Sequence, residues 1–186
     1  MYQERDYRKL MKADELICFN ITEYESDLQI YAKTNLKKEA EIAVVKYRKD
    51  IIDYISRYPE FLTSLVPVDS IVHASDIIQE MCHCSKLANV GPMAAVAGAV
   101  SKYAGRELLR YTDEILIENG GDLYIKSKND RRILIYAGNS PLSNKVALLI
   151  PGSDQELGIC TSSGTVGHSL SFGKADAAVV ISKNVC

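Results

Sequence analysis

The sequence ILIENGGDLYI, residues 115–125, decides how the chain is interpreted, because an apolar run enters a polar turn and a second apolar run leaves it. Two adjacent glycines, Gly120 and Gly121, allow a positive φ and let another backbone or a ligand come close. Asn119 and Asp122 flank them with short polar side chains that suit a turn and can also hold a ligand. The local sequence predicts a β-hairpin with at least one glycine at positive φ, and ligand binding is the alternative role for the same residues.

A second stretch, residues 158–173, is rich in Gly, Ser and Thr and contains a histidine. Hydroxyls and backbone N–H groups arranged in a concave loop can bind phosphate without a lysine, and a histidine titrates near neutral pH. A lone histidine is more often structural than catalytic, and Cys160 has no neighbouring charge that would stabilise a thiolate. The candidate residues of this stretch are Thr161, Ser162, Ser163, Gly164 and His168.

The composition is that of a globular protein, with 186 residues, 47% hydrophobic residues and a formal net charge of -2. This size fits a single domain over residues 1–186, or two lobes of about 1–110 and 111–186. The near-neutral charge argues against a general nucleic-acid binder. Residues 1–14 lack the apolar core of a signal peptide, and no apolar run approaches the roughly 20 residues of a membrane span. We therefore expect a cytoplasmic protein that binds neither nucleic acid nor membrane.

The five cysteines are an odd number, which fits a reducing compartment better than a disulfide framework. Cys82, His83 and Cys84 are consecutive on an expected helix, so their side chains diverge. We expect the two thiols to be reduced and to bind no metal, because no Cys-x-x-Cys pair exists.

The hydrophobic pattern predicts strands, then helices, then strands, which is an α+β arrangement rather than repeated βαβ units. The expected strands are residues 15–21, 26–32, 115–118, 123–126, 132–137, 145–150, 157–161 and 175–182. The expected helices are about 34–58, about 75–87 and a segment that begins at Pro92. The first helix carries a core stripe at helical spacing, formed by Leu36, Ala40, Ala43, Val44, Tyr47, Ile51, Ile55 and Tyr58.

The helix that begins after Gly91 contains almost only small residues between Met93 and Val100. Small side chains let a sheet pack closely against the helix. They also leave the unpaired N–H groups of the helix N-terminus open to an anion. Both roles remain open from the residues alone.

Three segments occur in an order that resembles an uncharacterised prokaryotic family related to the ApbE flavin transferases. They are VGPMAAVAGA (90–99), ENGGD (118–122) and GICTSSG (158–164), the last followed by HSLSFGKADA (168–177). The resemblance covers roughly residues 13–186 and implies an ApbE-like fold, a mixed or antiparallel sheet packed against helices. It also implies a pocket for FAD, FMN or another nucleotide. The residues implied for the pocket are Gly91, Met93, Asn119, Gly120, Gly121, Asp122, Thr161, Ser162, Ser163, Gly164 and His168.

The end of the chain departs from the transferase pattern. The transferases bind Mg²⁺ partly through an Ala-Asp-Ala-x-x-Thr motif on a helix after the last strand. Here Ala175-Asp176-Ala177 leads into a β-type run without the threonine, and the chain ends at Cys186, where that helix would begin. We therefore expect a truncated member without the C-terminal helix, without Mg²⁺ on this motif and without transfer of FMN to protein.

The resemblance also implies a role in anaerobic sulfur assimilation and homocysteine formation. Three functions stay open: an enzyme or enzyme component of sulfur metabolism, an FAD:protein FMN transferase, or a non-catalytic binding module. The expected partner is a nucleotide or anionic small molecule, together with a second copy of the chain or a partner protein.

Overall fold

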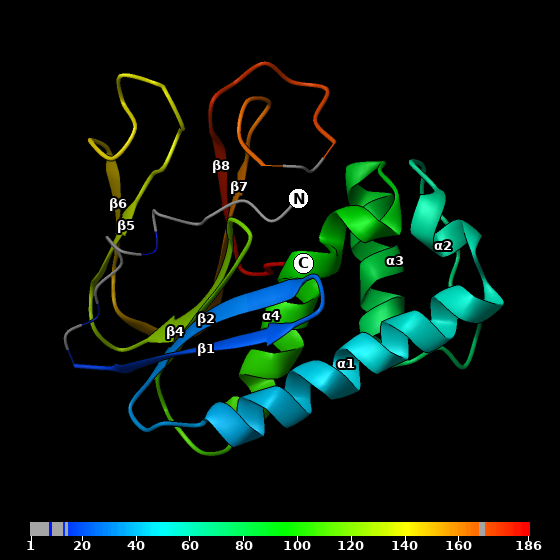
Figure 1. Ribbon diagram of the computed structural model, residues 1–186, viewed down its shortest axis with the longest axis horizontal. Helices are drawn as coiled ribbons and strands as arrows, with labels where there is room; N and C mark the ends of the chain where they lie inside the picture. Colours follow the sequence, from blue (N-terminus) through cyan, green and yellow to red (C-terminus); the bar gives the residue numbers. More distant parts are fainter. Residues whose placement is uncertain (1–7, 9–12, 14, 168–169) are drawn as a thin grey trace.

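The computed structural model describes residues 8, 13, 15–167 and 170–186. Its centre is a six-stranded sheet in the order β1-β2-β3-β4-β7-β8, in which every neighbouring pair is antiparallel. The strands are β1 (Ile17–Glu23), β2 (Ser26–Ala32), β3 (Ile115–Asn119), β4 (Asp122–Ser127), β7 (Ser153–Ser162) and β8 (Ala178–Ser182). A separate hairpin of β5 (Arg131–Leu134) and β6 (Ala147–Ile150) lies at the far left of Figure 1.

The helices follow β2 and precede β3, as the sequence predicts, so the fold is α+β. They are α1 (Lys37–Arg57), α2 (Glu60–Thr63), α3 (Asp76–Ala88), the 3₁₀ helix η2 (Pro92–Ala95) and α4 (Val96–Leu108). The long helix α1 packs on α4, and α4 contacts strands β3 and β4 (Figure 1). Among the described residues, none of these helices is both long and apolar enough to cross a membrane.

The sheet carries apolar side chains on both faces, because successive residues of a strand point to opposite sides. Ile115 and Ile117 of β3 join the larger core beneath the helices, whereas Leu116 between them joins a second cluster with Ile125 and Ile150. All residues of β2 and β3 are buried. Both faces of β2 and β3 are therefore covered, and the polar residues Asp27, Gln29, Glu118 and Asn119 are buried together with the apolar ones.

The predicted stripe of α1 lies against the larger core. The buried residues of this stripe are Leu36, Ala40, Ala43, Val44 and Ile51. The partly buried residues that pack against the larger core are Tyr47, Ile55 and Tyr58. The small residues of α4 serve close packing, because a Cβ at Gly105 would lie 2.3 Å from the ring of Tyr124. Within the small-residue run itself, a Cβ at Gly98 would lie 2.1 Å from the Val185 carbonyl oxygen. Close packing, one of the two roles that the sequence left open, is therefore found in this helix.

The β3–β4 hairpin turns through Gly120 and Gly121, whose φ angles are 63° and 101°. Asn119 pairs with Asp122 across the turn, which leaves the two glycines as its two-residue loop. The predicted hairpin and its positive φ are confirmed at both positions. Such angles favour glycine because a side chain there meets its own backbone.

Boundaries differ from the prediction mainly where the residues are polar. β7 begins at Ser153 rather than Leu157, because β4 continues past an irregularity after Ile125 and pairs Ser127 with Ser153. β8 begins at Ala178 rather than Ala175, whose carbonyl instead accepts the N–H of Gly164. The short helix α2 lies in a segment predicted to be a connection.

Candidate functional site

The Gly-Gly-Asp turn lies directly against the end of β7. The N–H of Thr161 donates to the carbonyl oxygen of Gly121 at 3.1 Å, and Asp122 pairs with Cys160 in the sheet register. A Cβ at Gly121 would lie 3.0 Å from the Thr161 oxygen. Two stretches that are distant in the sequence therefore meet at one end of the sheet.

The first turn of α4 joins the same place. The side-chain amide of Asn119 donates to the Ala97 carbonyl at 3.1 Å, and the N–H of Gly98 donates to the carboxylate of Asp122. Asp122 thus occupies the position at which an anion would meet the N-terminus of this helix. The hairpin turn, β7 and α4 form one junction.

Asp122 is the titratable group at the centre of the junction. Burial raises its pKa to about 6, against the opposing effect of the neighbouring Cys160 thiol and the Gly98 N–H, and the nearby charge of Glu118 raises it further. Burial and the Asp122 charge raise the pKa of the Cys160 thiol to about 12. Cys160 is therefore a neutral thiol and not a thiolate nucleophile, in line with the absence of a stabilising charge in its sequence.

A buried ion-pair network contacts the hairpin turn. It was not predicted from the sequence. Arg8 donates from Nε to Glu118 Oε2 at 2.6 Å and from Nη1 to Asp27 Oδ2 at 2.9 Å. The side chains of all three residues are less than one-tenth exposed. Glu118 Oε1 also accepts the N–H of Gly121 at 3.1 Å, so this turn N–H is held by the protein itself. The one signal in the sequence was a glutamate within the apolar run of β3.

The loop after β7 uses several of its N–H groups internally. Ser163 Oγ accepts the N–H groups of Thr165 and Val166 at 3.1 and 2.9 Å, and Gly164 donates to Ala175. The Thr165 hydroxyl donates to Asp176 at 2.9 Å. These bonds shape the loop, and they remove three of the N–H groups that the sequence offered for a phosphate. His168 lies outside the described residues.

Gly91 and Met93 contact parts of the structure other than the hairpin turn. A Cβ at Gly91 would lie 1.8 Å from the carbonyl oxygen of Ser64, so this glycine permits close contact with the segment after α2. Met93 is half-buried and packs on the larger core. The contacts from this region to the hairpin turn come one helical turn later, from Ala97 and Gly98.

A family model described as "AbpE bacteria" matches residues 8–186. The chain belongs to this family. It is 42% identical to a UPF0280 protein of Methanococcus aeolicus over 147 residues, which are 77% of this chain and 59% of the relative. It is also 42% identical to a UPF0280 protein of Methanocaldococcus jannaschii over 149 residues (79% and 60%), and 43% identical to one of Archaeoglobus fulgidus over 148 residues (79% and 60%). The chain therefore spans about three-fifths of these relatives.

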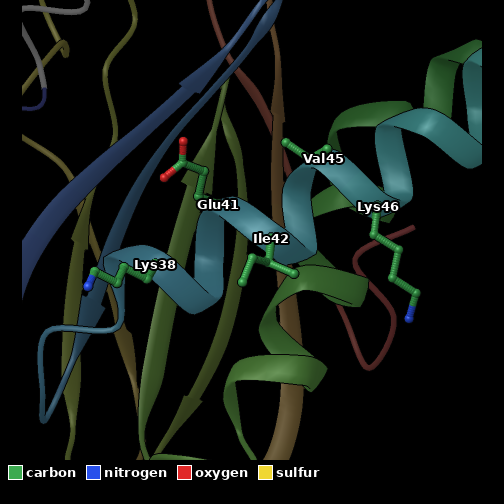
Figure 2. A pocket seen from close by; sticks show the side chains of 5 residues that line it. All are labelled: Lys38, Glu41, Ile42, Val45 and Lys46. Atoms are coloured by element: carbon green, nitrogen blue, oxygen red, sulfur yellow. The ribbon is translucent and has the colours of Figure 1, made fainter.

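In this AbpE-family chain, two surface hollows lie away from the junction. One, of about 570 Å³, is formed by the outer face of α1; Figure 2 shows its lining residues Lys38, Glu41, Ile42, Val45 and Lys46. The other, also of about 570 Å³, lies where β2 and α4 end. It is lined by Lys33, Thr34, Leu109, Arg110, Tyr111, Thr112, Asp113 and Lys126. Neither hollow includes a residue that the sequence predicted for the site.

Proposed function

We propose that this protein binds a flavin nucleotide, FAD or FMN, or another phosphate-bearing ligand at the junction of the hairpin turn, β7 and α4. The observation that supports this most is the set of direct hydrogen bonds joining Gly121 to Thr161 and Asn119 to Ala97. The three segments that resemble the ApbE pocket sequence are thus neighbours in space. A shared ligand explains why glycine and short polar side chains gather there.

We expect different parts of the ligand to contact different residues on two sides of the junction. Asp122, with a pKa of about 6, can accept or donate a hydrogen bond and faces a ribose hydroxyl or a ring N–H rather than a phosphate, because two anions repel. Ser162 is exposed and Thr161 is half-buried, so their hydroxyls can reach a ligand. The phosphate then lies toward the start of the loop after β7, where Ser162 is exposed and Ser163 is half-buried.

The biological reaction that we propose is a step of anaerobic sulfur assimilation leading to homocysteine, with this chain as an enzyme or as a component of one. The resemblance to the sulfur-associated family supports this role, and the chain covers 59–60% of the three relatives compared above. A non-catalytic module that binds the same ligand is the alternative. The half-buried, neutral Cys160 favours binding over thiol chemistry at this place.

FMN transfer is disfavoured by the surroundings of Asp176. This residue precedes strand β8 rather than a helix, and its carboxylate accepts the hydroxyl of Thr165. A transferase needs a metal to neutralise charge at the reacting phosphate. Incubation with FAD, Mg²⁺ and an acceptor protein is expected to leave the acceptor mass unchanged, and an FMN adduct would contradict this.

Ligand binding is tested by titrating FMN and FAD against the protein and following flavin fluorescence. Ser163→Asp retains an oxygen that can accept the Thr165 and Val166 N–H groups and adds one negative charge beside the proposed phosphate. We expect the dissociation constant to rise about tenfold, equivalent to about 1.4 kcal/mol of like-charge repulsion.

Ser153→Asp is the matched control, because Ser153 Oγ accepts the N–H of Gln155 in the same kind of turn at the other end of β7. It is expected to leave affinity unchanged. Equal weakening by both variants would show only a general effect of charge. Failure of the wild-type protein to bind FMN, FAD or inorganic phosphate would overturn the proposed function.

A further inference from the structure

Three metal-ligating side chains lie together on the side of α3 that faces the end of the chain. The ligand atoms of Glu80, Cys84 and Cys186 are all within 4.8 Å of one another, and all three residues are half-buried. Glu80 and Cys84 are four residues apart on α3, so they share one helix face. In tetrahedral zinc sites the metal–sulfur and metal–oxygen bonds are about 2.3 and 2.1 Å. Such bonds separate ligand atoms by less than 4 Å, so the cluster needs only a small contraction.

The segment that carries Cys186 is fixed in place by close packing. Val185 is 3% exposed, and it crosses two glycines that have no room for a side chain. A Cβ at Gly98 would lie 2.1 Å from the Val185 carbonyl oxygen, and one at Gly158 would lie 2.3 Å from its Cα. The chain after β8 thus runs between β7 and α4, where the C label stands beside α4 in Figure 1. Cys186 reaches the cluster by an ordered path.

Asn184 holds the cluster of ligand residues in place through hydrogen bonds from both ends of its side-chain amide. Its Nδ2 donates to Glu80 Oε1 at 3.0 Å and contacts Cys84 Sγ at 3.5 Å. Its Oδ1 accepts from Lys102 Nζ at 2.9 Å and from the N–H of Cys186 at 3.2 Å. Residues that hold metal ligands by hydrogen bonds in this way usually change metal affinity when they are replaced.

The charges of the cluster match a divalent cation bound by thiolates. Glu80 pairs with Lys102, whose side chain is 8% exposed, so these two charges cancel when both thiols are neutral. A cation of charge +2 bound by two thiolates adds no net charge to that pair. The half-buried site therefore remains neutral with the metal, and an unpaired buried charge is avoided.

We propose that Cys84, Cys186 and Glu80 bind a thiophilic divalent cation, with Zn²⁺ as the natural occupant and a water molecule as the fourth ligand. Two thiolates select zinc over magnesium or calcium, which prefer oxygen ligands. The expectation from sequence considered Cys84 only with Cys82 and His83. Cys82 indeed points away into the core, and Cys84 meets partners from the end of the chain. The metal site is independent of the proposed ligand at the hairpin turn.

The test uses Co²⁺ as a spectroscopic substitute for Zn²⁺ in the full chain, reduced with a phosphine until all five cysteines titrate as thiols. The wild-type protein is expected to bind about one equivalent, with thiolate charge-transfer and tetrahedral d–d bands that Zn²⁺ abolishes. Cys84→Ser and Cys186→Ser are each expected to weaken binding at least about a hundredfold, and Asn184→Ala about tenfold. Cys18→Ser, at an exposed cysteine on β1, is the control and retains wild-type binding.

Circular dichroism of each variant shows whether it is folded, so a loss of binding is assigned only to folded protein. Absence of the thiolate bands in reduced wild-type protein would overturn the proposal. Equal binding by wild type and the Cys84→Ser and Cys186→Ser variants would also overturn it. Formation of a Cys84–Cys186 disulfide by protein that takes up no Co²⁺ would assign these residues to a redox pair instead.

Discussion

At the scale of single residues, Asp122 carries the most unusual chemistry of the junction. Its carboxylate accepts the Gly98 N–H and lies beside the Cys160 thiol, yet burial keeps its pKa well above the ordinary value of 3.8. The sequence identified Asp122 as a candidate because it follows two glycines. Its partners Gly98 and Cys160 could not be predicted, because both contacts depend on how α4 and β7 pack against the hairpin.

The raised pKa of Asp122 makes stability depend on pH. The folded protein keeps its proton up to a pKa of about 6, whereas the unfolded chain releases it near 3.8. Ionisation of Asp122 therefore opposes folding; the cost is absent below about pH 4, grows as the pH rises to 6 and is complete above that value. Two pKa units correspond to about 3 kcal/mol.

Asp122→Asn removes this cost while keeping an oxygen for the Gly98 N–H. Relative to wild type, the variant is expected to gain up to about 3 kcal/mol of unfolding free energy between pH 4 and pH 8. Urea denaturation at both pH values measures the gain. Asp154→Asn, at an exposed position of β7, is the control and should show no such change. A variant that loses stability relative to wild type as the pH rises would contradict the assignment.

At the scale of elements, the hairpin β3–β4 and the helices α1 and α3 could be predicted, because their signals are local. Apolar spacing determines α1, and the two glycines determine the turn. The polar start of β7 could not be predicted, since its pairing with Ser127 depends on the neighbouring strand. The ion pairs of Arg8 with Asp27 and Glu118 were missed for the same reason: they join residues far apart in the sequence.

The hairpin provides a direct test of the turn geometry. Gly121→Val places a β-branched side chain at a φ of 101° and within 3.0 Å of the Thr161 oxygen. We expect a loss of about 2–3 kcal/mol in unfolding free energy, because β-branched residues are strained in this region. Gly173→Val is the control, since its nearest neighbour atom is 3.8 Å away. Equal stability of the two variants in urea denaturation would show that the turn tolerates a side chain.

At the scale of the whole molecule, the last residues of the chain connect the two proposed sites. Val185 packs on Gly98 and Gly158, and its carbonyl oxygen accepts the Cys160 thiol at 3.4 Å. The next residue, Cys186, belongs to the proposed metal cluster on α3. The sequence predicted neither the contacts of Val185 nor the cluster of Cys186, because both join residues that are far apart in the chain. A search for Cys-x-x-Cys motifs finds only ligands that are close in the chain. The order of strands and helices was predictable, whereas the path of this final segment was not.

The central claim is that the hairpin turn, β7 and α4 bind one ligand together. Amide chemical-shift changes on titration with FMN test it most directly, because each segment reports separately. The account predicts that amides of residues 97–98, 119–122 and 160–164 shift together with a single dissociation constant. Shifts confined to the hollow on α1 or to the hollow around Lys33 and Lys126 would contradict it, as would separate dissociation constants for the three segments.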